Sequence, residues 1–373
     1  MAHEAHTVQD KNTGRSILQL TNYIQRSVHG YYDLPPWSVI HGRIAFSRMD
    51  APDSKTGDIC VMDADGGNLR TVATSRVMSP NDGAMAQWAV DGSRIYFKDR
   101  DGDQRLIGWV NPDTGETGSH VGDLRMIRPT GHANAHFTHH GDYAHDDVVG
   151  LKDIHGMFIQ DLDTGDSQQL ATLADCVAIH PRRDEIANWH LYIKHTKWSP
   201  DGTRVMFVFT NEIHFDKLYD ELPRVKDMYV VNADGSDLKR VGEFGNHPLW
   251  HPNGQEILTN SPFDGEGGNK LVLTDVDTGK ERLATASMKG IGHPSFSPDG
   301  KHIVVDVVDN KTKAAQLELV NVEANTTETL IETTVTDHSH AGTHMHPVWR
   351  QDGSQILYAS DVSGISQLCV LDM

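Results

Sequence analysis

The stretch HPSFSPDG, residues 293–300, combines a histidine, an aromatic residue and an Asp-Gly step within eight positions. An Asp-Gly step favours a tight hairpin turn, because such a turn needs positive backbone φ angles. The run HIVVDVV that follows, residues 302–308, is rich in β-branched residues, which is typical of a strand. The stretch therefore predicts a short strand, a hairpin turn and a second strand.

The same pattern recurs along the chain. In each further copy Trp stands four residues before a Gly, and Asp or Asn precedes that Gly. A short β-type run follows each copy. The copies are MAQWAVDG (85–92), HTKWSPDG (195–202), HPLWHPNG (247–254) and HPVWRQDG (346–353). Two weaker copies are NAHFTHHG (134–141) and PPWSVIHG (35–42). A second hairpin follows the units, as in VVNADGSDLKRV (230–241). Repeated pairs of hairpins predict an all-β fold, a seven-bladed β-propeller with four-stranded blades and the repeated aromatic residues in its core.

The two ends of the chain predict how this propeller closes. The last repeat stops at LCVLDM (368–373), after its third strand. The missing turn and outer strand are supplied by DKNTGRSILQLTN (10–22). We therefore expect residues 16–21 to complete the last blade and close the ring, which removes exposed sheet edges. On this interpretation residues 1–373 form a single domain.

Composition excludes several classes of partner. The chain of 373 residues has 52 acidic and 33 basic residues and a net charge of −19, which argues against binding to nucleic acid or anionic membranes. Three widely spaced cysteines, Cys60, Cys176 and Cys369, form neither a disulfide framework nor a zinc motif. The sequence shows no apolar run long enough for a transmembrane helix and no signal peptide. We expect a cytoplasmic location; the oligomeric state is not indicated.

Histidine is the unusual component, with 23 residues. One repeat position, three residues before the aromatic residue, is histidine in four consecutive repeats: His195, His247, His293 and His346. We call this the ring position, because equivalent positions in a propeller lie at one height around a shared funnel. His344 precedes His346 by two residues, so an extended chain places both on one face. Asn134 takes the ring position in our alignment of the third blade, with His132 two residues before it.

These histidines have two interpretations. Three of them precede Pro, so each alone favours a structural role at the entrance of a blade. Four in register, together with His344, favour a metal or proton-transfer site, because convergent imidazoles are the usual ligand set. His338 and His340 lie in the preceding loop and fit either a solvent-exposed or a site position.

With these motifs the chain resembles the oligogalacturonate lyases, seven-bladed propellers that degrade short pectin fragments. The resemblance covers nearly the whole length, from TGRSILQLTNY (13–23) and YYDLPPW (31–37) to THMHPVWRQDGSQILYASDVSGISQLCVLD (343–372). It implies a divalent cation, manganese in the family, bound by His293, His344 and His346. Ala341 stands where the family has Gln, so one ligand is missing, and His340 is a candidate for its place.

The resemblance also implies a base and a substrate. His247 matches the family's base, and Arg224 is a weak match for an arginine near the fourth blade. A uronate lyase removes the proton at C5 beside the C6 carboxylate and expels the C4 oxygen. Neutral imidazoles hold a cation without cancelling its charge, and a separate histidine suits proton abstraction near neutral pH. His195 is a second candidate base; candidate contacts to an acidic oligosaccharide are His132, Tyr192, Lys194, Lys197 and Arg224.

Two alternatives stay open at the level of sequence. One is a related propeller lyase that acts on another uronide, such as a rhamnose-linked glucuronate, with His and Tyr alone. The other is a non-catalytic TolB-like propeller that binds protein or sugar, since the fold by itself does not determine function. The sequence contains no Gly-rich phosphate loop, no G-x-S-x-G motif and no HExxH motif.

Overall fold

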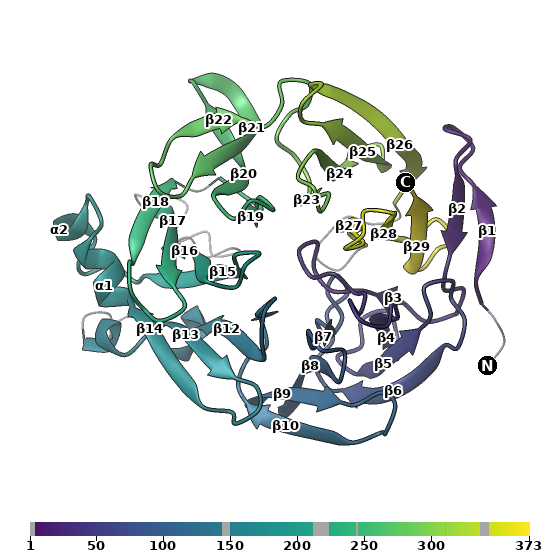
Figure 1. Cartoon of the computed structure of the whole chain (residues 1–373), viewed down its shortest axis with the longest axis horizontal. Helices are drawn as coiled ribbons and strands as arrows, with labels where there is room; N and C mark the ends of the chain where they lie inside the picture. Colours follow the sequence, from purple (N-terminus) through teal and green to yellow (C-terminus); the bar gives the residue numbers. More distant parts are fainter. Residues whose placement is uncertain (1–3, 144–149, 212–223, 244, 310, 336–342) are drawn as a thin grey trace. The chain divides into compact units, whose positions relative to one another are not determined.

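The computed structural model describes residues 4–143, 150–211, 224–243, 245–309, 311–335 and 343–373. The fold is a seven-bladed β-propeller of antiparallel blades, which confirms the fold predicted from the repeats (Figure 1). The chain divides into two compact units, one made of Met1–Leu124 and Thr285–Met373, the other of Arg125–Ala284. Each unit consists of whole blades, and each is described by itself. The expectation of a single domain stays a prediction.

The first unit contains blades one, two, six and seven. Blade one consists of β3 (Ser27–Val28), β4 (Ile44–Met49), β5 (Gly57–Met62) and β6 (Arg70–Ser75). Blade two consists of β7 (Gln87–Trp88), β8 (Ile95–Asp101), β9 (Gln104–Val110) and β10 (Thr117–Val121). Blade six consists of β23 (Pro294–Phe296), β24 (His302–Val308), β25 (Ala314–Asn321) and β26 (Thr326–Thr334).

The seventh blade combines both ends of the chain. Its strands are β27 (Val348–Trp349), β28 (Gln355–Ser360), β29 (Gln367–Asp372), β2 (Ser16–Gln19) and β1 (His6–Gln9). The pair Leu18–Val370 joins β2 to β29, and Leu20 N–H donates to Leu368 at 2.8 Å, as the sequence predicted (Figure 1). One detail of the prediction is wrong: β1 adds a fifth strand, because residues 6–9 pair with β2 as a hairpin.

The second unit contains blades three to five. Blade three consists of β11 (Met126–Ile127), β12 (Ala133–Phe137), β13 (Gly156–Asp161) and β14 (Ser167–Thr172). Blade four consists of β15 (Tyr192–Trp198), β16 (Arg204–Thr210), β17 (Lys226–Asn232) and β18 (Lys239–Glu243). Blade five consists of β19 (Leu249–Trp250), β20 (Glu256–Phe263), β21 (Glu266–Asp275) and β22 (Glu281–Leu283).

The alignment of the third blade was wrong by one strand. Residues 133–137 form the second strand, β12, and the first strand is β11, whose Ile127 pairs with Asn134. Asn134 is therefore not at the ring position, and His132 lies in the β11–β12 turn. The true first strand, Met126–Ile127, has no Trp before its turn. We therefore aligned Phe137, which does lie four residues before a Gly, with the Trp of the other repeats.

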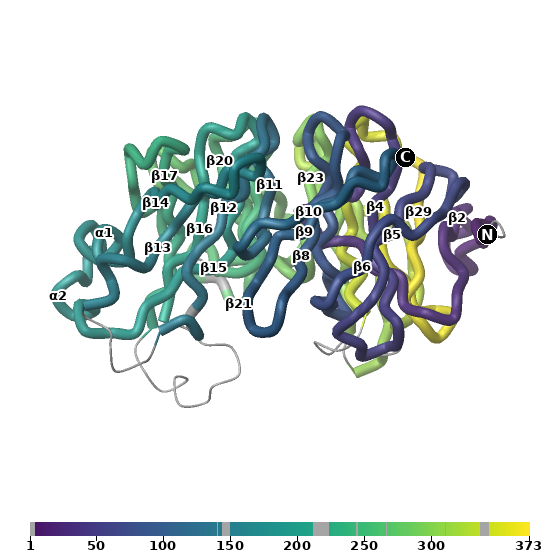
Figure 2. Tube along the Cα trace, turned by 90° about the horizontal axis from the view of Figure 1, so that it is seen from below, coloured from purple at the N-terminus to yellow at the C-terminus, as the bar shows by residue number. Residues whose placement is uncertain are grey.

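Short helices interrupt the second unit. They are the 3-10 helices η1 (His140–Asp142) and η3 (Gly150–Asp153) and the α-helices α1 (Leu173–Ala178) and α2 (Arg183–Ile186). The helix α1 packs against β14 and α2 (Figure 2). In the described part of the chain no helix is long and apolar enough to cross a membrane.

The repeated tryptophans do more than fill the core. The indole N–H of Trp88 donates to the carbonyl of Pro36 at 3.1 Å, and that of Trp349 donates to Ser295 at 3.1 Å. In the second unit the indole N–H of Trp250 donates to Lys197 at 3.2 Å. Each bond runs from one blade to the preceding one. The repeated Trp therefore links neighbouring blades by a hydrogen bond and also packs between their sheets.

Candidate metal centre

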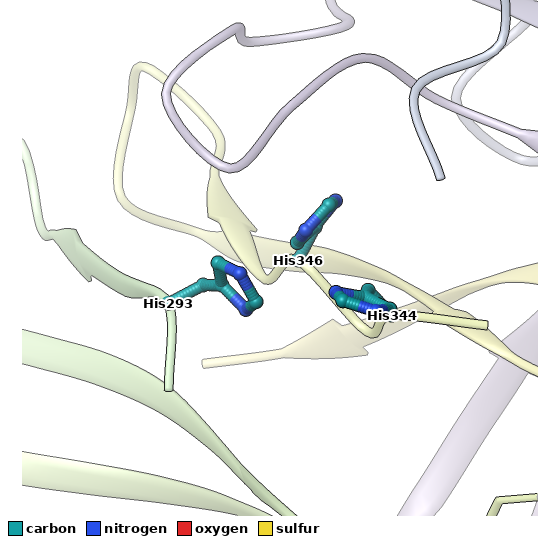
Figure 3. Close-up of side chains that lie close together, drawn as sticks. All are labelled: His293, His344 and His346. Atoms are coloured by element: carbon teal, nitrogen blue, oxygen red, sulfur yellow. The ribbon is translucent and has the colours of Figure 1, made fainter. Parts of the chain in front are cut away.

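Three histidines converge within the first unit. His293, just before β23, and His344 and His346, just before β27, place possible ligand nitrogens within 4.8 Å of one another. The three rings lie close together (Figure 3). His293 and His346 are buried, while His344 is partly exposed. The structure thus brings together the three histidines that the resemblance names as metal ligands, and their role as ligands stays a prediction.

The short segment before β27 carries two of these rings. Met345, between His344 and His346, is 0% exposed and belongs to a core cluster with Trp349 and Tyr358. On either side of Met345, the rings of His344 and His346 lie 5.3 Å apart between centroids. The predicted shared face of His344 and His346 is consistent with this arrangement.

A glycine positions the third ring. Gly292 has φ +64°, and a Cβ there would lie 1.7 Å from the backbone oxygen of Asp306. Only glycine permits this close approach. The approach brings the next residue, His293, against the Asp306 side chain.

Asp306, on β24, is the acceptor at the centre of this arrangement. Its Oδ1 accepts the backbone N–H of His293 at 2.6 Å, and both carboxylate oxygens lie 3.1 Å from His293 Nδ1. Its Oδ2 also accepts the backbone N–H of His346 at 3.2 Å. Burial alone would raise the pKa of this carboxyl, but His293 and the charge of His344 hold it well below its usual range. Asp306 is therefore a buried carboxylate beside two imidazoles.

Aromatic residues of blade one surround the triad. The Tyr31 ring lies 4.7 Å from that of His346, and the Tyr32 ring 5.5 Å from that of His293, between centroids. Burial raises the pKa of both phenols well above the ordinary value, so both are neutral. The His29 ring lies 6.4 Å from that of His346, and burial lowers its pKa to about 4 despite a hydrogen bond with the Met345 backbone. These three rings beside the triad are thus uncharged, and the charge next to the triad is that of Asp306.

The ring position has an unusual backbone. His346 has φ +44°, and the same repeat position is left-handed in His195, His247 and Met85, at φ +55°, +49° and +53°. A non-glycine residue in this region costs about 1–3 kcal/mol. Met85 shares the conformation without any ligand group, so the left-handed turn belongs to the entrance of blades two, four, five and seven whatever residue stands there. It directs the side chain at that position, and chemistry depends on which residue stands there.

The two candidate bases lie in the second unit. His247, before β19, is half-buried, and Asn260 Nδ2 lies 3.3 Å from its Nδ1. His195 is half-buried within β15, beside a register shift between Lys194 and Lys197. Their participation in chemistry stays a prediction.

The candidate substrate contacts differ in exposure. Lys194 is half-buried, whereas Tyr192 is 5% exposed and Lys197 2% exposed, so most of each of these two side chains is withdrawn from solvent. Arg224 is exposed, and its carbonyl accepts a hydrogen bond from Arg182 at 2.9 Å. His132 lies in the β11–β12 turn, and its Nδ1 is 3.3 Å from Asp163 Oδ2. His340, with Ala341 and His338, lies outside the described residues.

The donor set fits a divalent metal ion. Three imidazoles within 4.8 Å of one another can bond one ion at nitrogen–metal distances of about 2.0–2.2 Å. Imidazole suits several first-row transition metals, and neutral ligands leave the charge of the ion available to an anionic substrate. A metal-binding histidine usually donates a hydrogen bond to a carboxylate from the ring nitrogen that does not bind the metal.

Sequence reasoning missed the residues around the triad. Asp306 interrupts the apolar run HIVVDVV, and an acidic residue inside a buried strand is a detectable signal for a polar partner. Tyr31 and Tyr32 form part of YYDLPPW, but no repeat pattern linked that segment to the histidines. Their proximity depends on how blades one, six and seven pack within the first unit.

Comparisons with known proteins come from both sequence and structure. No family model matches the sequence. The uncharacterized peptidase YuxL of Bacillus subtilis is 24% identical over 171 residues, which are 45% of this chain and 22% of that protein. The chain therefore matches about a fifth of that relative's length.

Several solved structures share the fold. An oligogalacturonate lyase in complex with manganese has a TM-score of 0.74 at 18% identity, over 99% of this chain and 96% of that one. An oligogalacturonate lyase from Vibrio parahaemolyticus has a TM-score of 0.74 at 15% identity, over 100% and 97%. The β-propeller domain of the Trilobed protease from Pyrococcus furiosus has a TM-score of 0.58 at 10% identity, over 99% and 95%. Along nearly its whole length, the chain has the fold of the two oligogalacturonate lyases.

Proposed function

We propose that this protein is a metal-dependent lyase that cleaves uronate-containing oligosaccharides by β-elimination and leaves a 4,5-unsaturated uronate. The observation that supports this most strongly is the convergence of His293, His344 and His346 in front of Asp306. The fold shared with an oligogalacturonate lyase solved with manganese supports the same class of reaction. Oligogalacturonate is the substrate we propose, and manganese the ion.

The proposed reaction removes one proton and breaks one bond. His247 takes the C5 proton, the electron pair forms the C4–C5 double bond, and the C4–O bond breaks. The departing oxygen takes a proton from solvent. A bound divalent ion would neutralise the uronate carboxylate and favour the negative charge that develops as the proton leaves. The role of the imidazole triad is to bind that ion without adding negative charge.

Three neutral rings beside the triad are compatible with an anionic sugar. His29, Tyr31 and Tyr32 are all uncharged near neutral pH, so they add no repulsion to the carboxylate of a uronate. The net charge of −19 is spread over the chain, and its field is screened over about 8 Å at physiological salt. Local charge at the metal therefore outweighs the distant surface.

One observation favours a second candidate. Tyr31 and His346 have ring centroids 4.7 Å apart, and Tyr31 is partly exposed. A histidine and a tyrosine could together accept and donate a proton, which would suit a lyase on another uronide that needs no metal.

A substrate panel tests the proposal. The protein is incubated with oligogalacturonate, with rhamnose-linked glucuronate oligosaccharides and with a neutral galactan, and the ultraviolet absorbance of an unsaturated uronate is followed. Turnover of oligogalacturonate supports the first candidate, and turnover of the glucuronate substrate alone supports the second. Absence of an unsaturated product from every uronide would contradict both.

A further inference from the structure

Two blades pair their ring histidine with the same second-strand position. In blade six, Asp306 of β24 lies thirteen residues after His293 and contacts its Nδ1 at 3.1 Å. In blade five, Asn260 of β20 lies thirteen residues after His247, and its Nδ2 lies 3.3 Å from the Nδ1 of that ring. Both partners are buried, at 1% and 2% exposure. The repeat thus places a polar side chain against the same ring atom twice, once as a carboxylate and once as an amide.

The other two ring histidines have no polar residue at this position. Thirteen residues after His195 stands Val208, and thirteen residues after His346 stands Ala359. Neither side chain can form a hydrogen bond with an imidazole. The propeller framework therefore does not require a polar group there, so the Asp and the Asn need another explanation.

A carboxylate dictates one tautomer of its histidine. Ionised Asp306 only accepts hydrogen bonds, so His293 Nδ1 must carry the proton, and Nε2 keeps its lone pair. The negative charge also makes that nitrogen a stronger donor to a metal. Asp306 additionally binds the backbone N–H groups of His293 and His346, at 2.6 and 3.2 Å, so it fixes the chain as well as the ring.

An amide holds its histidine without charge. The Asn side chain offers either an acceptor oxygen or a donor NH2 group, so it orients an imidazole in either tautomer. It does not stabilise the imidazolium form as a carboxylate does. An imidazole held in this way is oriented by a neutral partner and can offer a lone pair to a proton. Asn260 therefore suits a histidine that acts as a base.

We propose that this position divides the ring histidines between two roles: Asp306 positions His293 as a metal ligand, and Asn260 positions His247 as an uncoordinated proton acceptor. The inference rests on the proposed function and assigns a positioning role to two residues that act through their histidines. Asp306→Asn should therefore impair metal binding, and Asn260→Asp should impair turnover.

The first test measures manganese affinity of Asp306→Asn from the electron paramagnetic resonance signal of free Mn²⁺. Loss of the carboxylate behind a ligand should weaken binding about 10–100-fold. The matched control is Asp227→Asn, which alters another buried Asp–His pair, 2.8 Å between Asp227 Oδ2 and His180 Nε2, in blade four. The control should lose stability and keep its affinity within about twofold. A folded Asp306→Asn protein that binds manganese as tightly as the wild type would overturn the Asp306 role.

The second test uses Asn260→Asp and holds even if Asp306→Asn does not fold. A carboxylate beside His247 stabilises the imidazolium, so the acidic limb of the kcat–pH profile at saturating manganese should move up by about one pH unit, which lowers kcat about tenfold on that limb. KM, manganese affinity and melting temperature should stay close to the wild-type values, which a merely structural role would not predict. A wild-type kcat–pH profile in a folded Asn260→Asp protein would overturn the Asn260 role.

The wild-type controls separate this inference from the proposed function. Wild-type protein that binds no manganese would overturn the metal-dependent function and the Asp306 role together. Manganese binding without turnover of any uronide would overturn the proposed reaction and the role of Asn260, while the affinity of Asp306→Asn would still decide the role of Asp306. Normal wild-type binding and turnover, with unaltered variants, would overturn this inference alone.

Discussion

The backbone N–H of His346 donates to Asp306 Oδ2 at 3.2 Å and so joins the entrance of blade seven to the second strand of blade six. The same carboxylate accepts the backbone N–H of His293 at 2.6 Å. Both segments that carry candidate ligands are therefore tied to one buried side chain. A site held in this way needs little rearrangement when an ion binds.

Manganese should raise the melting temperature through this site. An ion that binds only the native state adds about 2.7 kcal/mol at a concentration 100 times its Kd. His344→Ala removes one of three ligands and should abolish most of the shift. His302→Ala, a histidine of β24 outside the triad, should keep it. The measurement is thermal unfolding with manganese and with chelator; an equal shift in His344→Ala and wild type would contradict the site.

His247→Ala should lower kcat by about 10²–10⁴-fold, the usual contribution of a general base. Manganese affinity and melting temperature should change little, because His247 is not in the metal triad. A purely structural role before Pro248 predicts the reverse, a lower melting temperature with nearly normal turnover. Steady-state kinetics and thermal unfolding of one purified variant separate the two roles.

His195→Ala should lower kcat by less than about tenfold. His195 shares the ring position, yet Val208 stands where His247 has Asn260, and a valine side chain cannot form the hydrogen bond that we assign to a base. Comparing kcat of His195→Ala and His247→Ala, at saturating metal and substrate, shows which histidine contributes more to turnover. A larger loss in His195→Ala than in His247→Ala would reverse the assignment.

Leu20→Ala should lower the free energy of unfolding by about 2–5 kcal/mol, because it leaves a cavity beside the strand that completes blade seven. Leu20 is 0% exposed and belongs to a core cluster with Leu368 and Val370. Ile24→Ala is the control, since Ile24 is 84% exposed and its loss should cost no more than about 0.5 kcal/mol. Urea unfolding measures both; equal effects would contradict the packing of the N-terminal strand.

The three thiols should be unreactive in the native protein. Burial raises the pKa of Cys60 and of Cys369 to about 12, and raises that of Cys176 as well. A thiol with such a pKa is about 10⁻⁴ ionised at pH 8, and the thiolate is the reactive form. Ellman's reagent should therefore react only after urea is added. Rapid reaction of the native protein at pH 8 would show that a cysteine is accessible.

The repeats explain why most of the fold was predictable. Trp four residues before Gly, with Asp or Asn before that Gly, locates the first hairpin of a blade, and the truncated last repeat locates the N-terminal strand. Blade three was misaligned because β11 has neither Trp nor an Asp-Gly turn. The fifth strand β1 was not predicted, since its residues HTVQ are mostly exposed and carry little hydrophobic pattern.

The site was predictable only where it follows the repeat. His293, His344 and His346 were found because a period of two and a shared repeat position place them together. Asp306 occupies a repeat position too, but its role depends on the close approach that Gly292 permits, which spacing alone does not reveal. Tyr31 and Tyr32 reach the triad through packing between blades of the first unit, a tertiary relationship without a local signal.

The most direct test of metal-dependent elimination is turnover of oligogalacturonate by one preparation in three states: as purified, after chelator, and after chelator followed by excess manganese. The predicted result is a rise in the ultraviolet absorbance of the unsaturated uronate, its loss with chelator, and its return with manganese. Unsaturated product formed at the same rate in chelator, by protein that metal analysis shows to be metal-free, would contradict the central claim.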